Sequence, residues 1–381
     1  MLLFNFRMAL KHNSIVSKSL YEGMRLLLIL SFLGVNPLMA QSWQSLSDYP
    51  GIAVDDASAF SIGDTAYFGA GLTSWWAPRA NFFGLDLQTY QWFSIAALPA
   101  GKERHYAAAF STDFHGYLFG GYNGQDFLND LWRYNPQLDQ WTELSPLPDS
   151  GRSGMACFRL GDTAYFVGGK NDSNYAMAEV WAYAISTDTW HQLQDFPFGA
   201  RWAASATALS GKGYLLFGRN EQDEFQKGFY SYHAQGDQWT HLLDFMGSGR
   251  SHACLQRIGG DLYAGFGIDS AGNYYSDWQI YDGLSRSWQS LNAIPGAARK
   301  GGMAISKEGK FIYSTGINAA GQWIKETWLY EAQLSLAENK AEGNRKLLQI
   351  VDLLGRPISQ EVKGVQIWLY SDGSSEKHWR P

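Results

Sequence analysis

Arginine recurs at a fixed spacing in this 381-residue chain, and guanidinium groups at regular positions suggest anion binding. The repeated residues are 49 places apart, except that the first stands one place late: Arg104, Arg152, Arg201, Arg250 and Arg299. A guanidinium binds carboxylate, sulfate or phosphate groups through paired hydrogen bonds. If the fold brings these side chains to one opening, they form a site for an anion or an acidic sugar. The alternative is a structural role, in which they hydrogen-bond backbone carbonyls of neighbouring repeats.

Aromatic residues outside the regular spacing are the second group of candidate ligand contacts. Trp75, Trp76 and Tyr122 occupy expected loops and do not recur. Trp202 and His252 closely follow repeated arginines and are expected to reach the same opening. Rigid aromatic rings beside polar groups suit sugar faces and peptide side chains. Other loop aromatics share the 49-residue register and are expected to pack inside the fold: Phe127, Phe225, Tyr274 and Trp323.

Carboxylates near these cations are the candidates for catalysis. Moving a proton at a sugar requires an acid or a base within hydrogen-bonding reach of the substrate. The candidates near Arg219 are Glu221, Asp223 and Glu224, and Asp55 lies where the arginine register reaches the first repeat. The simpler interpretation of all four is a solvated loop charge. No spacing in the sequence is typical of a zinc site, a calcium loop, a phosphate loop or a nucleophile elbow, so we expect neither a metal nor a cofactor.

A 49-residue repeat supplies the elements that must position these residues. Tryptophan recurs at this interval at Trp43, Trp92, Trp141, Trp190, Trp239 and Trp288. Glycine does the same at Gly71, Gly120, Gly169, Gly218, Gly267 and Gly316. Further series of tyrosine and proline keep the same period. The coincidence of these residue types in one period indicates six copies of one structural unit.

Each unit has the pattern of short strands separated by turns. In the third unit, the segments rich in apolar, aromatic or small residues are 154–158, 163–169, 180–183 and 190–193. Glycine, aspartate, asparagine and serine gather between them, as is typical of turns. A four-stranded unit cannot bury both faces alone, whereas radial stacking of six units buries them and leaves only short edges. The pattern predicts an all-β fold with six blades around an axis.

The units resemble kelch repeats. The shared pattern is an arginine near the start of the unit, a hydrophobic strand ending in two glycines, a tyrosine, and then a tryptophan and Leu-Pro. Gly120-Gly121 keeps the glycine pair, whereas Gly267-Ile268 relaxes it. The resemblance covers about residues 41–335 and is specific for the fold but not for function. It implies a six-bladed kelch β-propeller in which the arginines lie near one mouth of the central channel, on the same face as the loops after the second strands.

The ring is expected to close through its N-terminal strand. Trp43 and Pro50 carry the signal of a fourth strand with no first three strands before it. Residues 311–313 and 328–330 supply the second and third strands of a last unit, but Ala337 stands where the next tryptophan is due. We therefore expect the N-terminal strand to complete the last blade.

The N-terminal end of the chain has the order of a signal peptide. Residues 1–40 contain Arg25, an apolar run and Ala40 at a plausible cleavage point, with Met24 as an alternative start. The apolar run is too short to span a bilayer. We predict export of a mature protein without a transmembrane segment, whose propeller occupies residues 41–337.

The C-terminal residues 338–381 leave the repeat. A polar linker is followed by short expected strands, which form a small β tail. The tail resembles the C-terminal sorting domain of Bacteroidetes proteins exported by the type IX system, through residues 352–356 and 364–373, although the usual Pro-Asn-Pro start is absent. The resemblance implies the type IX secretion machinery as a partner and a secreted or cell-surface location.

Composition excludes other classes of function. The net charge of −6 argues against nucleic acid as a partner, because phosphate binding requires clustered lysine and arginine. We expect a monomer that binds a glycan or a protein ligand at the channel mouth without catalysing a reaction. The enzymatic alternative is a sialic-acid (N-acetylneuraminate) epimerase or mutarotase of kelch type, since that family is also six-bladed and exported. A structural component of the envelope or of adhesion is a third interpretation.

Overall fold

The computed structural model describes residues 43–332, 347–352, 356–359, 361–370 and 375–380. Every regular element in these ranges is a β-strand, and none of them contains a helix long and apolar enough to cross a membrane. The predicted signal peptide and polar linker lie outside the described residues and stay predictions.

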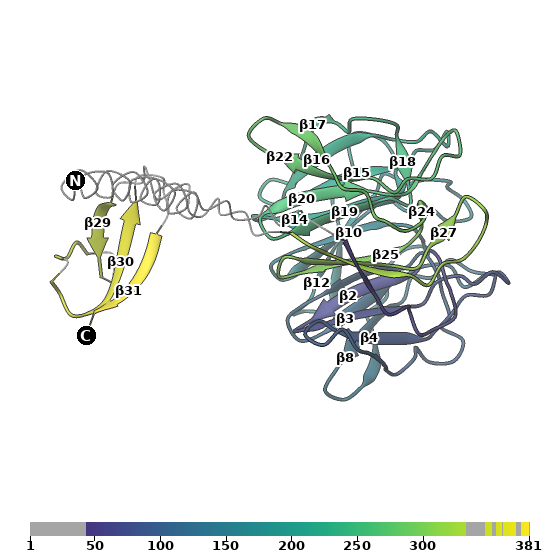
Figure 1. The fold of residues 1–381 in the computed structure, drawn as a ribbon, viewed down its shortest axis with the longest axis horizontal. Helices are drawn as coiled ribbons and strands as arrows, with labels where there is room; N and C mark the ends of the chain where they lie inside the picture. Colours follow the sequence, from purple (N-terminus) through teal and green to yellow (C-terminus); the bar gives the residue numbers. More distant parts are fainter. Residues whose placement is uncertain (1–42, 333–346, 353–355, 360, 371–374, 381) are drawn as a thin grey trace, which may run out of the picture. The chain divides into compact units, whose positions relative to one another are not determined.

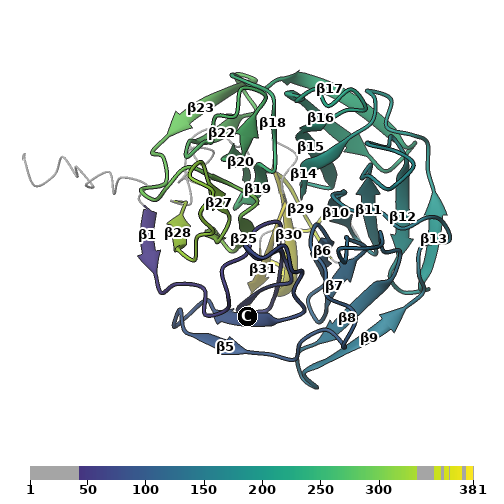
Figure 2. The same ribbon diagram turned by 90° about the vertical axis from the view of Figure 1, so that its right-hand side faces the viewer.

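Six antiparallel four-stranded sheets stand as blades around a central axis, as Figures 1 and 2 show. Blade 1 consists of β2 (Ser58–Ile62), β3 (Thr65–Gly69), β4 (Phe82–Asp86) and β5 (Trp92–Ser94). Blade 2 consists of β6 (Ala108–Ser111), β7 (Gly116–Phe119), β8 (Leu131–Asn135) and β9 (Gln140–Leu144). Blade 3 consists of β10 (Ala156–Leu160), β11 (Thr163–Val167), β12 (Val180–Ala184) and β13 (Thr189–Gln192). The predicted all-β, six-bladed propeller is confirmed.

The second half of the ring repeats this order. Blade 4 consists of β14 (Trp202–Leu209), β15 (Lys212–Arg219), β16 (Gly228–His233) and β17 (Gln238–Asp244). Blade 5 consists of β19 (Cys254–Ile258), β20 (Asp261–Gly265), β22 (Trp278–Asp282) and β23 (Ser287–Leu291). Blade 6 consists of β25 (Met303–Lys307), β26 (Lys310–Ser314), β28 (Thr327–Glu331) and β1 (Trp43–Leu46).

Two additional strand pairs lie at one end of the propeller. They are β18 (Arg250–Ser251) with β21 (Ile268–Asp269), and β24 (Arg299–Lys300) with β27 (Ile317–Asn318). They lie at the right-hand end of the propeller in Figure 1, which faces the viewer in Figure 2. This end carries the start of each inner strand and is called the channel mouth below.

The N-terminal strand closes the ring, as predicted. β1 pairs with β28 in an antiparallel register in which Trp43 lies opposite Tyr330. The Trp43 ring contacts the rings of Tyr330 at 5.1 Å, Trp278 at 5.8 Å and Phe311 at 5.9 Å. Figure 2 shows β1 beside β28 at the rim. The first and last parts of the propeller sequence are therefore joined in one sheet.

The hydrophobic core lies between blades rather than inside any one of them. One cluster, for example, joins Phe110 and Phe119 of blade 2 to Phe166 and Trp181 of blade 3. Five further clusters join the remaining neighbouring pairs of blades. Since burial of apolar area is the main stabilising term, each blade depends on both neighbours.

Hydrogen bonds from the repeated outer residues connect neighbouring blades. Trp141 donates from its indole nitrogen to the carbonyl of Ala96 in the preceding blade at 2.9 Å. The Tyr134 hydroxyl donates to Asp139 at 2.8 Å, and the same carboxylate accepts a hydrogen bond from the Ala96 amide. The arrangement recurs one repeat later with Trp190, Tyr183, Asp188 and Ser145. These bonds explain why tryptophan and tyrosine hold the 49-residue period.

The described C-terminal residues form a separate three-stranded antiparallel sheet. Its strands are β29 (Leu347–Val351), β30 (Gly364–Tyr370) and β31 (Ser375–Arg380). The expected short strands of the tail are therefore present. The sorting role of this segment stays a prediction.

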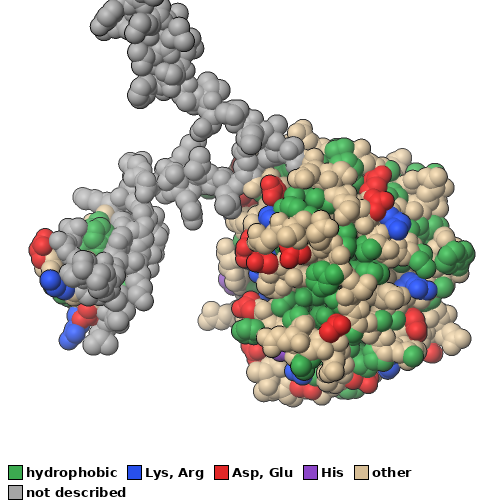
Figure 3. All heavy atoms as spheres, turned by 60° about the horizontal axis from the view of Figure 1, so that its bottom comes forward, with side chains coloured by type: hydrophobic (Ala, Val, Ile, Leu, Met, Phe, Trp, Pro, Cys, Tyr) green, Lys and Arg blue, Asp and Glu red, His purple; other side chains and the backbone are tan. Residues whose placement is uncertain are grey.

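The surface drawn in Figure 3 mixes charge and apolar side chains. Acidic and basic groups alternate with hydrophobic patches, and this face of the described residues carries no continuous basic area. A duplex or single-stranded nucleic acid requires such an area. The surface accords with the acidic net charge of the chain.

Candidate functional site

The five repeated arginines are buried between the blades rather than presented at the mouth. Their exposed fractions range from 0% to 2% for Arg104, Arg152, Arg201, Arg250 and Arg299. The Arg104 guanidinium binds Asp130 through two bonds of 2.7 and 3.0 Å. The Arg250 guanidinium binds Asp277 through two bonds of 2.6 and 2.8 Å. Arg299 is paired with Glu326 through a single guanidinium nitrogen.

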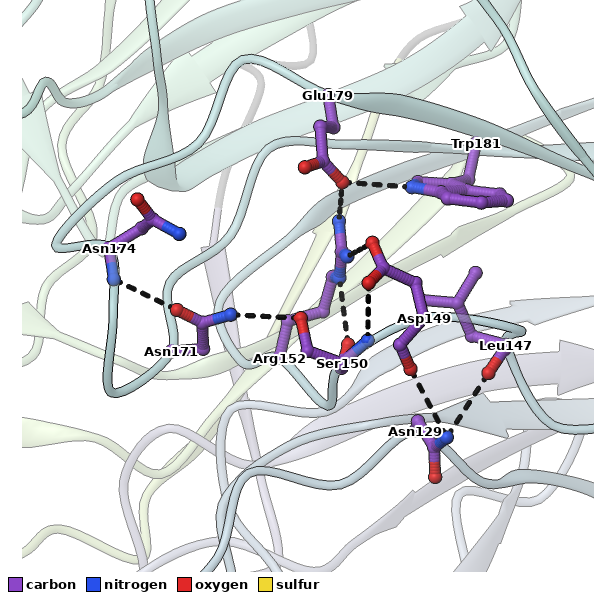
Figure 4. Close-up of polar contacts among 9 residues, drawn as sticks. All are labelled: Asn129, Leu147, Asp149, Ser150, Arg152, Asn171, Asn174, Glu179 and Trp181. Atoms are coloured by element: carbon purple, nitrogen blue, oxygen red, sulfur yellow. Dashed lines mark hydrogen bonds and ion pairs between the residues drawn. The ribbon is translucent and has the colours of Figure 1, made fainter.

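Figure 4 shows the contacts of one of these residues, Arg152. Its guanidinium donates to Glu179 at 2.8 Å and to Asp149 at 2.7 Å. Glu179 also accepts a hydrogen bond from the Trp181 indole at 3.1 Å. The donors are thus occupied by groups of the protein itself.

Arg201 has a different set of partners. It donates to the carbonyl of Ala200 at 2.8 Å and lies 5.4 Å from the ring centre of Phe196. No carboxylate in the described residues pairs with it. The expectation of an arginine-lined mouth is therefore corrected: each guanidinium turns inward, where its blade offers a carboxylate, a carbonyl or a ring.

The channel mouth is built on a closed ring of backbone hydrogen bonds. One residue per blade contributes, two places after each repeated arginine and, in blade 1, two places after Val54: Asp56, Tyr106, Gly154, Ala203, His252 and Gly301. Each amide donates to the carbonyl of the ring residue in the preceding blade, at 2.7–3.2 Å, and Asp56 closes the circle by donating to Gly301. All six have φ between +52° and +68°, which is costly for residues other than glycine. We call these six residues the mouth ring.

Three side chains of the mouth ring meet in one buried cluster. The Tyr106 hydroxyl hydrogen-bonds to Asp56 and lies 3.3 Å from Nε2 of His252. The same His252 nitrogen lies 3.9 Å from Oδ1 of Asp56. The Nδ1 atom of His252 lies 2.9 Å from Oγ of Ser251, which fixes the imidazole plane. A carboxylate, a phenol and an imidazole thus converge from blades 1, 2 and 5.

The environment shifts the titration of each group in this cluster. Burial raises the pKa of Asp56 to about 7, and the charge of Asp55 adds to the rise while Lys300 opposes it. Burial lowers the pKa of His252 well below its usual value, with Lys300 and other cations acting in the same direction. Burial and Asp56 raise the pKa of Tyr106. At neutral pH, His252 is uncharged and Asp56 exchanges protons readily, as suits an acid or a base.

Three cationic side chains surround this cluster. Lys300 lies 3.6 Å from Asp55 and 4.0 Å from Asp56. Lys170 lies 4.0 Å above the Trp202 ring, and the Arg219 guanidinium lies 5.4 Å from the same ring. Burial lowers the pKa of Lys170, and the nearby charge of Arg219 lowers it further. Two like charges are therefore held beside one indole.

Within the described residues, the Arg219 guanidinium hydrogen-bonds through two of its three nitrogens. Its Nε donates to Ser251 at 3.0 Å and its Nη1 to Asp223 at 3.0 Å. Asp223 also accepts a bond of 2.6 Å from the Tyr175 hydroxyl. No ion pair joins Lys170 to a carboxylate within the described residues. A ligand carboxylate at this place would find two positive donors.

The predicted aromatic residues divide into two groups. Trp202 and His252 lie together at the mouth with ring centres 5.4 Å apart, and Tyr122 lies 5.7 Å from the His105 ring nearby. Trp75 and Trp76 occupy the loop after β3, where 72% and 75% of their surface is exposed. Among the residues in register, Trp323 is fixed by hydrogen bonds to Asp55 and Leu72, in agreement with a packing role.

The predicted carboxylates are not the ones that join the cluster, apart from Asp55. Glu221 and Glu224 are exposed in the loop after β15, and Glu224 accepts a hydrogen bond from Asn220 at 2.7 Å. Asp55 is buried beside the mouth ring, where it accepts the Trp323 bond and faces Lys300. The sequence interpretation missed Asp56, Tyr106, Lys170 and Lys300 as site residues. The signal lay in the position two places after the arginine, where Asp56, Tyr106 and His252 replace the small residues of the other blades.

Two small cavities follow the axis inward from the mouth. The first, of about 150 Å³, is lined by the mouth ring and its neighbours. The second, of about 200 Å³, is lined mainly by alanines, with Cys157, Cys254 and Gln256. No group of three histidine, cysteine or acidic side chains that could hold a metal occurs in the part of the chain that the structure describes. The mouth thus combines an acid–base cluster of Asp56, Tyr106 and His252 with nearby cationic side chains.

Comparison with known proteins supports the fold and adds named relatives. Residues 55–218 match the KLHDC2/KLHL20/DRC7 Kelch-repeats domain. A solved protein described as "Structure of YjhT" superposes with a TM-score of 0.67 over 76% of this chain and 98% of its own, at 18% identity. Together with the 49-residue period, these findings show a six-bladed β-propeller, and its residues 55–218 match a kelch-repeat family model.

Two bacterial relatives carry an enzyme name. N-acetylneuraminate epimerase of Haemophilus influenzae (strain PittEE) is 32% identical over 132 residues, which is 33% of this chain and 33% of that protein. N-acetylneuraminate epimerase of Pasteurella multocida (strain Pm70) is 36% identical over 114 residues, which is 28% of this chain and 29% of the relative. The chain thus matches about a third of the length of these relatives.

Proposed function

We propose that the channel mouth binds a monosaccharide that carries a carboxylate, of the sialic-acid type. The observation that carries the proposal is the pair Lys170 and Arg219, which flank the Trp202 ring from neighbouring blades. Arg219 is bound to Asp223 through one guanidinium nitrogen, and Lys170 pairs with no carboxylate within the described residues. A ligand carboxylate would bind the Lys170 ammonium and the remaining guanidinium donors of Arg219, and the indole would cover an apolar sugar face. The printed name of the bacterial relatives, N-acetylneuraminate epimerase, points to the same ligand class.

The first test is calorimetric titration with N-acetylneuraminate. We expect Arg219→Gln to weaken binding by at least about tenfold, because a charge-assisted hydrogen bond contributes on the order of 1.5–3 kcal/mol. Arg257→Gln is the matched control: this arginine is exposed near the opposite end of the channel and donates to the Gly259 carbonyl. The neutral sugar N-acetylmannosamine should bind weakly to every variant.

Equal binding of the acidic and the neutral sugar would reject the carboxylate site, as would an unchanged affinity of Arg219→Gln. If neither sugar binds and a glycan array is also negative, the protein-ligand and structural interpretations are favoured instead. These outcomes separate sugar recognition from the remaining roles of an exported propeller.

The second candidate function is epimerase or mutarotase activity on the same sugar. The cluster of Asp56, Tyr106 and His252 favours it, because anomer exchange requires proton transfer alone. A base takes the proton of the anomeric hydroxyl while an acid protonates the ring oxygen, and the carbon–oxygen bond of the ring breaks. Closure on the other face reverses these steps, so that no oxidant or co-reactant is consumed.

The activity is tested by following the decay of the α-anomer of N-acetylneuraminate by proton NMR. We expect Asp56→Asn to reduce the catalysed rate by at least about 100-fold with little change in sugar affinity. Because the pKa of Asp56 is raised to about 7, its base form grows as the pH rises, so the catalysed rate should increase between pH 6 and pH 8. Asp113→Asn, in an exposed turn of blade 2, is the control. An unaffected rate in Asp56→Asn would leave binding as the function.

A further inference from the structure

The pairing of a buried arginine with a carboxylate is missing from blade 1. In blades 2, 3, 5 and 6 the arginine binds a carboxylate just before the third strand: Asp130, Glu179, Asp277 and Glu326. Blade 4 keeps its arginine, Arg201, but has Gly228 at the acidic position of the 49-residue register. In blade 1 both positions differ.

Backbone hydrogen bonds fix which residues of blade 1 are equivalent. The glycine after each second strand donates to the carbonyl of the arginine in the next blade, as Gly71 does to Arg104 and Gly267 does to Arg299. At the seam between blades 6 and 1, Gly316 donates to Val54 in the same way. Val54 therefore occupies the place of the arginine.

The acidic position is identified by the same kind of bond. The Gly120 amide donates to the carbonyl of Asp130 in blade 2, and the Ala70 amide donates to that of Asn81 in blade 1. Asn81 therefore occupies the place of the carboxylate. Where blades 2, 3, 5 and 6 have a buried ion pair, blade 1 has a buried valine and an exposed asparagine.

A hollow of about 450 Å³ lies at this position. It is bounded by the segment that leads from β1 into blade 1, by blade 1 itself and by the last loop of blade 6; its lining includes Tyr49, Pro50, Ile52, Val54, Asn81 and Phe83. Sites for small ligands span roughly 300–1,000 Å³, so the hollow has room for one molecule of monosaccharide size.

Two cations complete the lining. The Arg79 backbone carbonyl accepts a hydrogen bond from the Arg104 amide, and the residues that do the same in later blades are uncharged: Leu128, Met177, Gln226 and Tyr275. Its guanidinium donates to Oδ1 of Asn81 at 3.1 Å. Lys325 also lines the hollow. Within the described residues, no ion pair joins Arg79 or Lys325 to a carboxylate, and the hollow has no acidic lining residue.

We propose that this hollow, called the seam pocket, is a second binding site, separate from the channel mouth, for a small carboxylate with an apolar body. The ligand carboxylate takes the place of the missing acid and binds Arg79 and Lys325. Its body lies against Pro50, Ile52 and Phe83. The Tyr49 and Phe83 rings, whose centres are 5.2 Å apart and nearly perpendicular, form a rigid aromatic wall.

The test compares phenylacetate with its uncharged isostere phenylacetamide by calorimetric titration of the whole chain. We expect phenylacetate to bind at least about tenfold more tightly, and Arg79→Gln to remove that preference. Arg257→Gln serves again as the control. N-acetylneuraminate binding at the channel mouth should be unchanged in Arg79→Gln, so that failure of one site is distinguishable from failure of the other.

A double variant that restores the repeat gives an independent test. Val54→Arg with Asn81→Asp places in blade 1 the pair that Arg104 and Asp130 form in blade 2. We expect it to fill the seam pocket and abolish phenylacetate binding while the propeller stays folded. Equal affinity for phenylacetate and phenylacetamide would overturn the proposal, as would undiminished phenylacetate binding in Arg79→Gln. The single variant decides the matter if the double variant does not fold.

Discussion

At the scale of single residues, the repeat supplies the framework, and departures from it mark the candidate site. The arginines that hold the period are buried and paired. Asp56, Tyr106 and His252 share a ring position at which other blades have glycine or alanine, and they form the acid–base cluster. Three blades have a small residue at this ring position, and in the other three blades the longer side chains at the same position meet in the cluster.

The framework role of the arginines predicts a loss of stability on substitution. Arg104→Met removes the paired hydrogen bonds of Arg104 to buried Asp130, which keeps only the part-exposed Lys102 and the Trp132 indole, and breaking a buried pair costs up to about 3–5 kcal/mol. Denaturant unfolding should show that decrease in the free energy of unfolding, whereas Arg257→Met should change it by less than about 0.5 kcal/mol. If Arg104→Met kept its stability but lost N-acetylneuraminate binding, the arginine would be a ligand contact instead.

The sequence predicted which residues recur but not what the site residues do. The regular arginines were recognised, yet their burial depends on carboxylates 26 or 27 places later, such as Asp130 and Glu179, that have no motif around them. Asp56 and His252 are close only because six blades close into a circle. The two side chains become neighbours only when the ring closes, and the spacing of residues within one repeat does not predict that contact.

At the scale of elements, the period located the strands well. In the third repeat the expected strand at 180–183 is observed as β12 over Val180–Ala184, and the one at 190–193 as β13 over Thr189–Gln192. The pairs β18–β21 and β24–β27 were not expected. Their strands are only two residues long and depend on a turn that folds the chain back at the mouth. Two residues are too few to show the alternation of apolar and polar side chains that predicts a strand.

Closure by β1 predicts that its tryptophan stabilises the whole ring. Trp43→Ala removes ring contacts to Trp278, Phe311 and Tyr330 and the hydrogen bond to the Asn292 carbonyl. Truncating a large aromatic residue of this kind costs about 3 kcal/mol or more. Thermal melting should fall accordingly, while Gln44→Ala, at an exposed position of the same strand, should leave it nearly unchanged. Identical melting of Trp43→Ala and the native chain would show that the strand does not lock the ring.

At the scale of the whole molecule, the propeller is a circle of equivalent interfaces. Six hydrophobic clusters each span two neighbouring blades, so the fold has no single centre and no free first or last blade. One seam carries the join of the two ends of the ring, and the same seam carries the seam pocket. The irregularity needed for closure is therefore also the place where the repeat has been modified.

The mouth ring has a consequence for how an anion is attracted. Helix ends and loops often hold anions with free backbone amides, but all six ring amides are already donors to ring carbonyls. Attraction at the mouth then falls to side-chain charges such as those of Lys170 and Arg219, which dissolved ions screen. Raising the ionic strength from about 0.05 M to about 0.5 M should weaken N-acetylneuraminate binding by about tenfold, as measured by titration in sodium chloride. A constant affinity would mean that the sugar is held by neutral hydrogen bonds instead.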